Sequence, residues 1–193
     1  MSEKGPEFNQ QKIEQKEKEP EIQIERITDL DDGTLKQISE VEKSCFPEQI
    51  AEDEEELREV LENPEGIHLK IKDEEGKIFG YISSLRQDQE FDLLKKHDLN
   101  LKKEDGVFYV HSFDIVPGKR SLRTFNRAWN ALKEEAVKEE YKKLIMYART
   151  SNGLSRVFQK RYGAEFFRRI ENWRGLGEPF DYLEIELPEK KRK

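Results

Sequence analysis

Residues 107–116, VFYVHSFDIV, are the run with the strongest β-strand preference in the chain. Most of these residues are apolar whichever way they point, and a strand that is apolar on both faces is typical of the middle of a covered sheet. The run therefore predicts a central strand, and the rest of the fold has to be built around it.

Strand-like and helix-like patterns alternate before and after this run. Apolar residues at period two predict strands, and apolar residues at helical spacing predict helices. In chain order, the patterns predict a strand at 22–27, helices at 35–45 and 52–63, a hairpin of strands at 67–73 and 77–85, the strand at 107–116, a helix at 121–140, a strand at 143–150, a helix at 152–163, and two antiparallel strands at 165–173 and 180–187. The sum is an α/β domain with a mixed sheet of about seven strands and about four flanking helices.

Two of these elements have specific predicted faces. The expected buried stripe of the 121–140 helix is Leu122, Phe125, Trp129, Leu132 and Ala136. In the strand after Gly163, period two places Phe166, Arg168 and Ile170 on one face and Phe167, Arg169 and Glu171 on the other.

The ends of the chain differ in composition from its middle. Residues 1–20 alternate Glu, Lys and Gln with almost nothing to bury, which predicts a disordered charged tail, and residues 189–193 form a basic tail. Residues 21–188 are the expected domain. Within it, the polar segment 87–105 predicts an inserted short helix or lid.

The overall charge excludes some classes of protein. A formal net charge of -7 disfavours nucleic-acid binding, which needs a net basic face. The single cysteine, Cys45, cannot form an internal disulfide, and the first residues contain no apolar segment that would serve as a signal peptide or membrane span. We therefore expect a cytoplasmic protein with no nucleic-acid or membrane partner; the oligomeric state is left open.

The 121–140 helix carries its charges the wrong way round. Arg120, Arg123 and Arg127 lie at its start, where the helix dipole is positive, and glutamates crowd its C-terminal half. A bound polyanion such as a phosphate group would resolve this conflict. The alternative is that acidic residues elsewhere, such as Asp114 or the 52–59 run, pair with these arginines.

The element order and the local text together resemble the GNAT superfamily of acyl-CoA-dependent N-acetyltransferases, over about residues 22–187. In IVPGKRSLRTF, Ile115 and Pro117 are similar to the turn that ends the central strand of that family, and Arg120 is similar to the first residue of its pyrophosphate loop. In ARTSNGLSRVFQKRYGA, Asn152 and Gly163 match the segment after its fifth strand.

This resemblance implies acetyl-CoA as a co-substrate and an amine acceptor, either a small molecule or a peptide. It places acetyl-CoA against the start of the 121–140 helix. The implied coenzyme contacts are Ile115, Val116, Arg120, Ser121, Leu122, Arg123, Thr124, Phe125 and Asn152. Cys45, Phe46 and Pro47 resemble the text that borders the acceptor site in members acting on amines and protein N-termini, so the acceptor would approach from there and from the 87–105 insert.

The sequence also departs from the family pattern. The family loop has Gly at the position of Arg123 and Gly or Ala at the position of Phe125. Ser121 occupies a position that is often Gly in the family. Gln159 stands where the family often has a Tyr as general acid, with Tyr162 nearly one turn further on. Two hypotheses follow. Either the arginines replace the lost backbone contacts and the protein is an N-acyltransferase, or it is a non-catalytic binding module of the same fold that has lost coenzyme A binding.

His111, on the predicted central strand, is the candidate general base because imidazole titrates near neutral pH, and Asp114 is second if burial raises its pKa. The alternative for His111 is a packed residue with satisfied nitrogens. Cys45 is a candidate nucleophile only because it is a cysteine. The alternative is that it is a buried thiol at the end of a helix. The acids at 52–59 would favour a cationic amine, unless they are a solvated helix face. No metal-ligand spacing is found, so we expect no metal.

Overall fold

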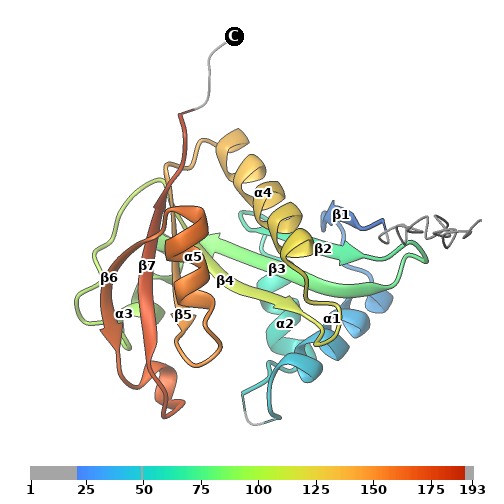
Figure 1. Ribbon diagram of the computed structural model, residues 1–193, viewed down its shortest axis with the longest axis horizontal. Coiled ribbons are helices and arrows are strands. Elements are labelled where there is room, and N and C mark those ends of the chain that lie inside the picture. The colour runs from blue at the N-terminus through green and yellow to red at the C-terminus, as the bar shows by residue number, and fades with distance from the viewer. Residues whose placement is uncertain (1–20, 49, 190–193) are drawn as a thin grey trace, which may run out of the picture.

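The computed structural model describes residues 21–48 and 50–189. Its strands form one mixed sheet in the order β1-β2-β3-β4-β5-β7-β6 (Figure 1). The strands are β1 (Gln23–Arg26), β2 (Ile67–Lys72), β3 (Ile78–Arg86), β4 (Val107–Ile115), β5 (Lys143–Arg149), β6 (Glu165–Ile170) and β7 (Phe180–Glu186). The helices are α1 (Asp32–Cys45), α2 (Glu54–Leu61), α3 (Gln87–Lys95), α4 (Leu122–Lys138), α5 (Leu154–Tyr162) and the short 3-10 helix η1 (Trp173–Gly175).

The predicted α/β class and the mixed seven-stranded sheet are confirmed. Within the described residues there are five α-helices rather than about four, because the 87–105 insert contributes α3. The predicted tail at 1–20 and residues 190–193 of the basic tail lie outside the described residues.

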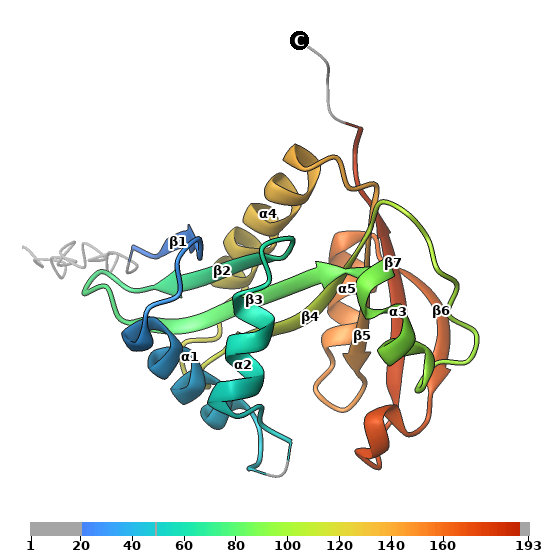
Figure 2. The same ribbon diagram turned by 180° about the vertical axis from the view of Figure 1, so that it is seen from behind.

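Helices cover both faces of the sheet (Figures 1 and 2). On one face, Trp129 of α4 and Phe158 of α5 belong to the largest apolar core. On the other face, α1 and α2 pack against Tyr81 of β3, and Leu94 of α3 packs with Tyr109 of β4. β4 thus lies in the interior of the sheet with both faces covered, as its sequence predicts.

Local chemistry fixes where several helices begin and end. α2 starts with a capping box in which the Asp53 side chain accepts from the Glu56 amide and the Glu56 side chain accepts from the Asp53 amide. The Asp31 side chain accepts from the Thr34 amide at the start of α1. α5 ends at Gly163, whose φ of 69° is the left-handed conformation that glycine adopts without strain.

β4 and β5 are paired over only part of their length. Their parallel register runs from Val107 opposite Lys143 to Val110 opposite Met146, although β4 continues to Ile115 and β5 to Arg149. On its other side, β4 carries a bulge: Val110 pairs with Ser84 and Ser112 with Ser83, which leaves His111 as the extra residue. The sheet is therefore open between the C-terminal ends of β4 and β5.

The predicted stripe of α4 is correct except at its first residue. Trp129, Leu132 and Ala136 are fully buried and Phe125 packs against the same core, but Leu122 is 45% exposed. Leu122 is the first residue of the helix, and its place in the stripe is taken by Thr124 and Ala128, which are buried.

The predicted alternation in β6 is wrong at its start. Phe166 pairs with Leu183 of β7, and Arg168 pairs with Tyr182, the residue adjacent to Leu183. A bulge at Phe167 therefore shifts the register. Phe166 and Arg168 therefore do not share a face. Phe166 and Phe167 are 48% and 51% exposed, because a bulge bends the strand locally.

The insert is attached to the sheet by a buried ion pair. Asp98, in the loop after α3, accepts hydrogen bonds from Arg168 of β6 and from the hydroxyl of Tyr147 on β5. Within the insert, Leu94 of α3 is fully buried, whereas Leu99, in the loop that follows, is 78% exposed. The segment is a short helix followed by an anchored loop.

His68 on β2 predicts a loss of stability in acid. It is 2% exposed, its ring nitrogens have no hydrogen-bond partner among the described residues, and burial lowers its pKa to about 4. The ring lies so close to Gly66 that a Cβ there would be 2.1 Å from Nε2.

The unfolded chain binds a proton at this histidine near pH 6.5, before the folded chain does. The free energy of unfolding should therefore fall by up to about 3 kcal/mol between about pH 6.5 and about pH 4. Urea unfolding of the protein and of His68→Gln across this range measures the effect. An equally steep fall in the variant would contradict the assignment to His68.

Candidate active site

Two cavities meet at the open end of the sheet. The inner cavity, of about 140 Å³, lies between the separated ends of β4 and β5, and residues from His111 to Asp114 and from Met146 to Arg149 line it. The outer cavity, of about 420 Å³, extends from there to the start of α4. Phe46, Phe113, Asp114, Arg149, Asn152 and Leu154 line both.

Most of the residues that the resemblance implies as coenzyme contacts line the outer cavity. They are Ile115, Arg120, Ser121, Leu122, Phe125 and Asn152. Val116, Arg123 and Thr124 do not line it. The same cavity contains Cys45 and Phe46 of the expected acceptor segment, whereas Pro47 is exposed and lines neither cavity.

The start of α4 is organised around its backbone. The Ser121 hydroxyl accepts from the Thr124 amide at 3.0 Å, which caps the helix. The Nε of Arg120 donates to the carbonyl of Ile115 at 2.8 Å. Among residues 21–48 and 50–189, no carboxylate lies within ion-pair distance of Arg120 or Arg127, although the charge of Arg120 acts on Asp114, one of the acids that the alternative named.

Phe125 does not stand free in the loop. Its ring stacks on Phe113 of β4 with centroids 4.5 Å apart and packs against Phe158 and Tyr162 of α5. The side chain that replaces a small residue in the family pattern is thus part of the core beneath the helix start.

His111 has a partner at each ring nitrogen. Its Nε2 lies 3.2 Å from Oε1 of Glu52, and its Nδ1 lies 3.3 Å from the Ser83 hydroxyl. An ionised carboxylate can only accept, so Nε2 carries the proton of the neutral ring and Nδ1 accepts from Ser83. The ring is 7% exposed and lines the inner cavity.

Glu52 is kept ionised by this contact. Burial alone would raise its pKa, but the hydrogen bond and charge of His111, with help from Arg174, lower the pKa overall. The sequence indicates Glu52 only as one of the acids at 52–59 and gives no sign of its contact with His111. No local signal separates it from Glu54, Glu55 and Glu56, which are exposed.

Asp114 lies in a buried acidic group. Burial, and then the charges of Glu42 and Glu52, raise the pKa of Asp114 well above its usual range. Glu42 also has a raised pKa because of burial, although it accepts from the Tyr81 hydroxyl at 2.6 Å. Oδ2 of Asp114 has no partner among the described residues, and the side chain reaches both cavities. A protonated carboxyl here can donate a proton.

The other reactive candidates have structural partners. Cys45 Sγ lies 3.4 Å from the Ile115 carbonyl, and burial, then Asp114, raise the pKa of the thiol. The Gln159 amide donates to the Ser155 hydroxyl at 3.0 Å, and the Tyr162 hydroxyl bonds Asn126. A thiol held in its neutral form is a poor nucleophile.

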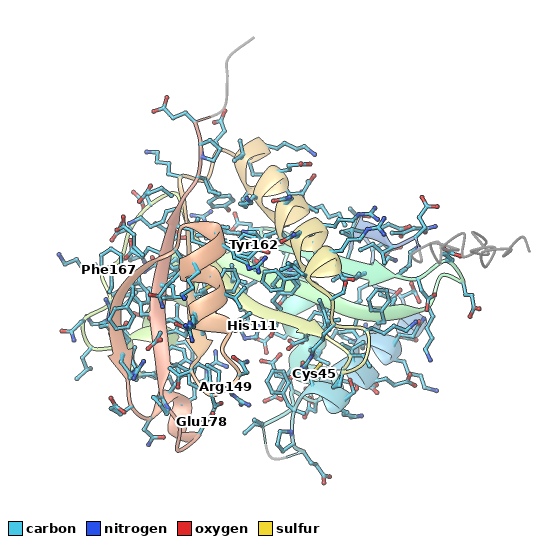
Figure 3. All side chains as sticks on the ribbon, in the orientation of Figure 1. Cys45, His111, Arg149, Tyr162, Phe167 and Glu178 are labelled. Carbon is cyan, nitrogen blue, oxygen red and sulfur yellow. The ribbon has the colours of Figure 1, made fainter. Side chains whose placement is uncertain are left out.

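Arg149 was not expected from the sequence. It ends β5 (Figure 3), and its guanidinium carbon lies 5.7 Å from the ring centroid of Phe46, an expected acceptor residue, and 5.8 Å from that of Phe180. Its Nε lies 3.4 Å from Glu178. Asn152, which the resemblance does imply as a coenzyme contact, lies just before α5 and accepts a hydrogen bond from the Leu154 amide at 2.9 Å.

The described part of the chain shows neither a cluster of metal ligands nor a membrane-spanning helix. There, no three or more His, Cys, Asp or Glu side chains are placed to hold a metal ion together. Over the same residues, no helix combines the length and apolar character that a membrane crossing requires.

Comparisons with known proteins identify the fold. No protein-family model matches the sequence, and no curated sequence matches it either. Among solved structures, the ribosomal-protein-S18-alanine N-acetyltransferase from Escherichia coli is similar at a TM-score of 0.64 and 11% identity, covering 90% of this chain and 97% of that one. An aminoglycoside 6'-N-acetyltransferase complexed with coenzyme A is similar at 0.65 and 14%, covering 88% and 99%.

A GCN5-related N-acetyltransferase from Kribbella flavida is similar at a TM-score of 0.62 and 12% identity, covering 86% of this chain and 98% of that one. The chain therefore has the GNAT acetyltransferase fold over nearly all of its described residues. At these identities the likeness concerns the fold.

Proposed function

We propose that the protein is an acyl-CoA-dependent N-acyltransferase, with residues 21–188 as its catalytic domain, that moves an acetyl group from acetyl-CoA to a primary amine. The observation that carries the proposal is the open end of the sheet. There, the unpaired ends of β4 and β5 border a cavity that continues to the arginine-rich start of α4. We also propose a cytoplasmic location, on the sequence grounds given above.

The start of α4 is the proposed site for the coenzyme phosphates. The guanidinium groups of Arg120, Arg123 and Arg127, near the positive end of the helix dipole, would bind phosphate oxygens. Leu122 and Asn152 would border the remainder of the coenzyme in the outer cavity. The exposed position of Leu122 agrees with a role in contacting a ligand rather than the core.

His111 is the proposed acceptor of the amine proton. The Glu52 carboxylate orients the ring through its contact with Nε2. The proton is accepted at Nδ1, because Nε2 already carries one, so the hydrogen bond from the Ser83 hydroxyl has to open for the amine to approach. Asp114, whose pKa is raised well above its usual range by burial, is the proposed donor of a proton to the coenzyme, because Gln159 stands in the sequence in place of the family tyrosine.

Calorimetric titration of acetyl-CoA and of free coenzyme A tests the coenzyme site. We expect binding to the unmodified protein, and a loss of about 100-fold or more in affinity when Arg120, Arg123 and Arg127 are replaced together by alanine. No binding of any acyl-CoA to the unmodified protein would overturn the proposal and favour a non-catalytic module.

A matched variant controls for the loss of three positive charges. Arg156, Lys160 and Arg161 of α5 are exposed and line neither cavity. Replacing them together by alanine should leave coenzyme affinity within a few-fold of its original value. An equal loss in both triple variants would mean that net charge, rather than a site on α4, controls binding.

A further inference from the structure

Arg149 is held in one orientation on the wall of the inner cavity that His111 also lines (Figure 3). Its guanidinium carbon lies 5.7 Å from the ring centroid of Phe46 and 5.8 Å from that of Phe180. Its Nε faces Glu178, which is itself fixed by a 2.7 Å hydrogen bond from the Ser151 hydroxyl. A guanidinium fixed between aromatic rings is preorganised for a ligand.

The terminal amino groups of Arg149 are available. Among the described residues, its Nη1 and Nη2 form no hydrogen bond, and the contact with Glu178 is at Nε, at 3.4 Å. The planar fork of a guanidinium matches the two oxygens of a carboxylate, so these groups form a binding site for a carboxylate that enters the cavity.

The remaining charges at the inner cavity separate into two ends. At one end is His111, with the ionised Glu52 behind its ring, and this pair suits an amine. At the other end is Arg149, which repels a second positive group. Burial raises the pKa of the neighbouring Asp114 well above its usual range and also raises the pKa of Glu42, which weakens their opposition to this polarity.

The size of the inner cavity limits the acceptor. Its volume of about 140 Å³ is below the range of about 300–1,000 Å³ that is usual for drug-sized ligands. The contact of Phe46 and Phe180 with Arg149 also joins the two sides of the open end, which narrows access for a chain.

We propose that the amine acceptor is a free amino acid, with its amino group at His111 and its carboxylate on Arg149. This inference rests on the proposed function and specifies its acceptor. The amino nitrogen forms a bond to the acyl carbon, the carbon–sulfur bond of the thioester breaks, the amine proton passes to His111, and coenzyme A leaves as the thiolate, which then takes up a proton. A peptide N-terminus lacks the carboxylate at this position, because it is an amide.

Matched acceptors test the proposal directly. Each common amino acid and its own α-carboxamide are offered with acetyl-CoA, and release of free thiol is followed. For at least one amino acid we expect kcat/KM to exceed that of its carboxamide by about 10- to 100-fold, the usual effect of hydrogen bonds to a charged group. Equal use of the acid and the amide, or faster use of a peptide that begins with the same residue, would overturn the proposal.

Substitution of Arg149 assigns the discrimination to this residue. Arg149→Met should reduce kcat/KM for the amino acid to the value for its carboxamide and leave the carboxamide unchanged. Arg149→Lys, which keeps the charge but not the fork, should recover part of the difference. Arg156→Met, on the exposed face of α5, is the control and should change neither value. Loss of coenzyme A affinity in Arg149→Met would place the residue in the coenzyme site and overturn the proposal.

The failure of the proposed function can be told apart from the failure of this inference. If acetyl-CoA binds but acid and amide are used equally, only the inference fails. If no acyl-CoA binds, the proposed function fails, and the same acid and amide pairs are compared by thermal shift of the protein alone. A stabilisation by the acid that Arg149→Met abolishes would support the carboxylate site, and its absence would overturn it.

Discussion

Asp98→Asn is expected to lower the free energy of unfolding by about 3 kcal/mol, which is the lower part of the range for breaking a buried ion pair. Asp98 is 2% exposed, and it accepts from both Arg168 and Tyr147. Asparagine keeps the shape but removes the charge that balances Arg168. We choose the lower part of the range because the Arg168 side chain is 23% exposed and can regain some contact with water.

Urea unfolding followed by fluorescence measures this change. Asp32→Asn serves as the control, because its ion pair with Arg58 is on the surface and the Asp32 side chain is 94% exposed. A surface pair contributes about 1 kcal/mol or less. Similar effects of the two substitutions would contradict the view that the Asp98 pair anchors the insert.

His111→Ala is expected to reduce kcat/KM for acetyl transfer by about 10²- to 10⁴-fold, the usual contribution of a positioned general base. Acetyl-CoA affinity should change little, because His111 lines the inner cavity and not the outer one. Transfer rates and calorimetric affinities of the same preparations measure both effects.

His97→Gln is the matched control for this substitution. His97 packs edge-on against Trp173, outside both cavities, so the variant should transfer acetyl groups at close to the original rate. A transfer rate that survives in His111→Ala would remove His111 from the reaction. It would leave the histidine as a packed strand residue with satisfied nitrogens.

The regular elements could be predicted because their signals are local. The β4 run has apolar residues on both faces, and the structure places it in the interior of the sheet. The bulges at His111 and Phe167 could not be predicted from period two, because the register of a strand depends on its neighbour. Leu122 was placed in the core because helical spacing alone does not reveal where a helix begins to pack.

Site residues could be predicted where a stretch of the sequence resembles a motif of the GNAT superfamily. Ile115, Arg120 and Asn152 were named on that basis, and all three line the outer cavity. Glu52 and Arg149 were missed, because each acquires its importance from contacts with segments distant in the sequence. Because these contacts join segments that are far apart in the sequence, no rule based on local residue spacing could have found Glu52 or Arg149.

The order of strands in the C-terminal half has a consequence for how the protein is made. β7 follows β6 in the chain but lies between β5 and β6 in the sheet. During synthesis, β6 therefore has no sheet partner until β7 has left the ribosome, whereas β1 to β4 can already pair with one another. Until that moment the edge of β5 remains open to other chains. A ribosome that stalls before residue 180 would hold a chain in which five of the seven strands, β1 to β5, can pair and the edge of β5 is exposed.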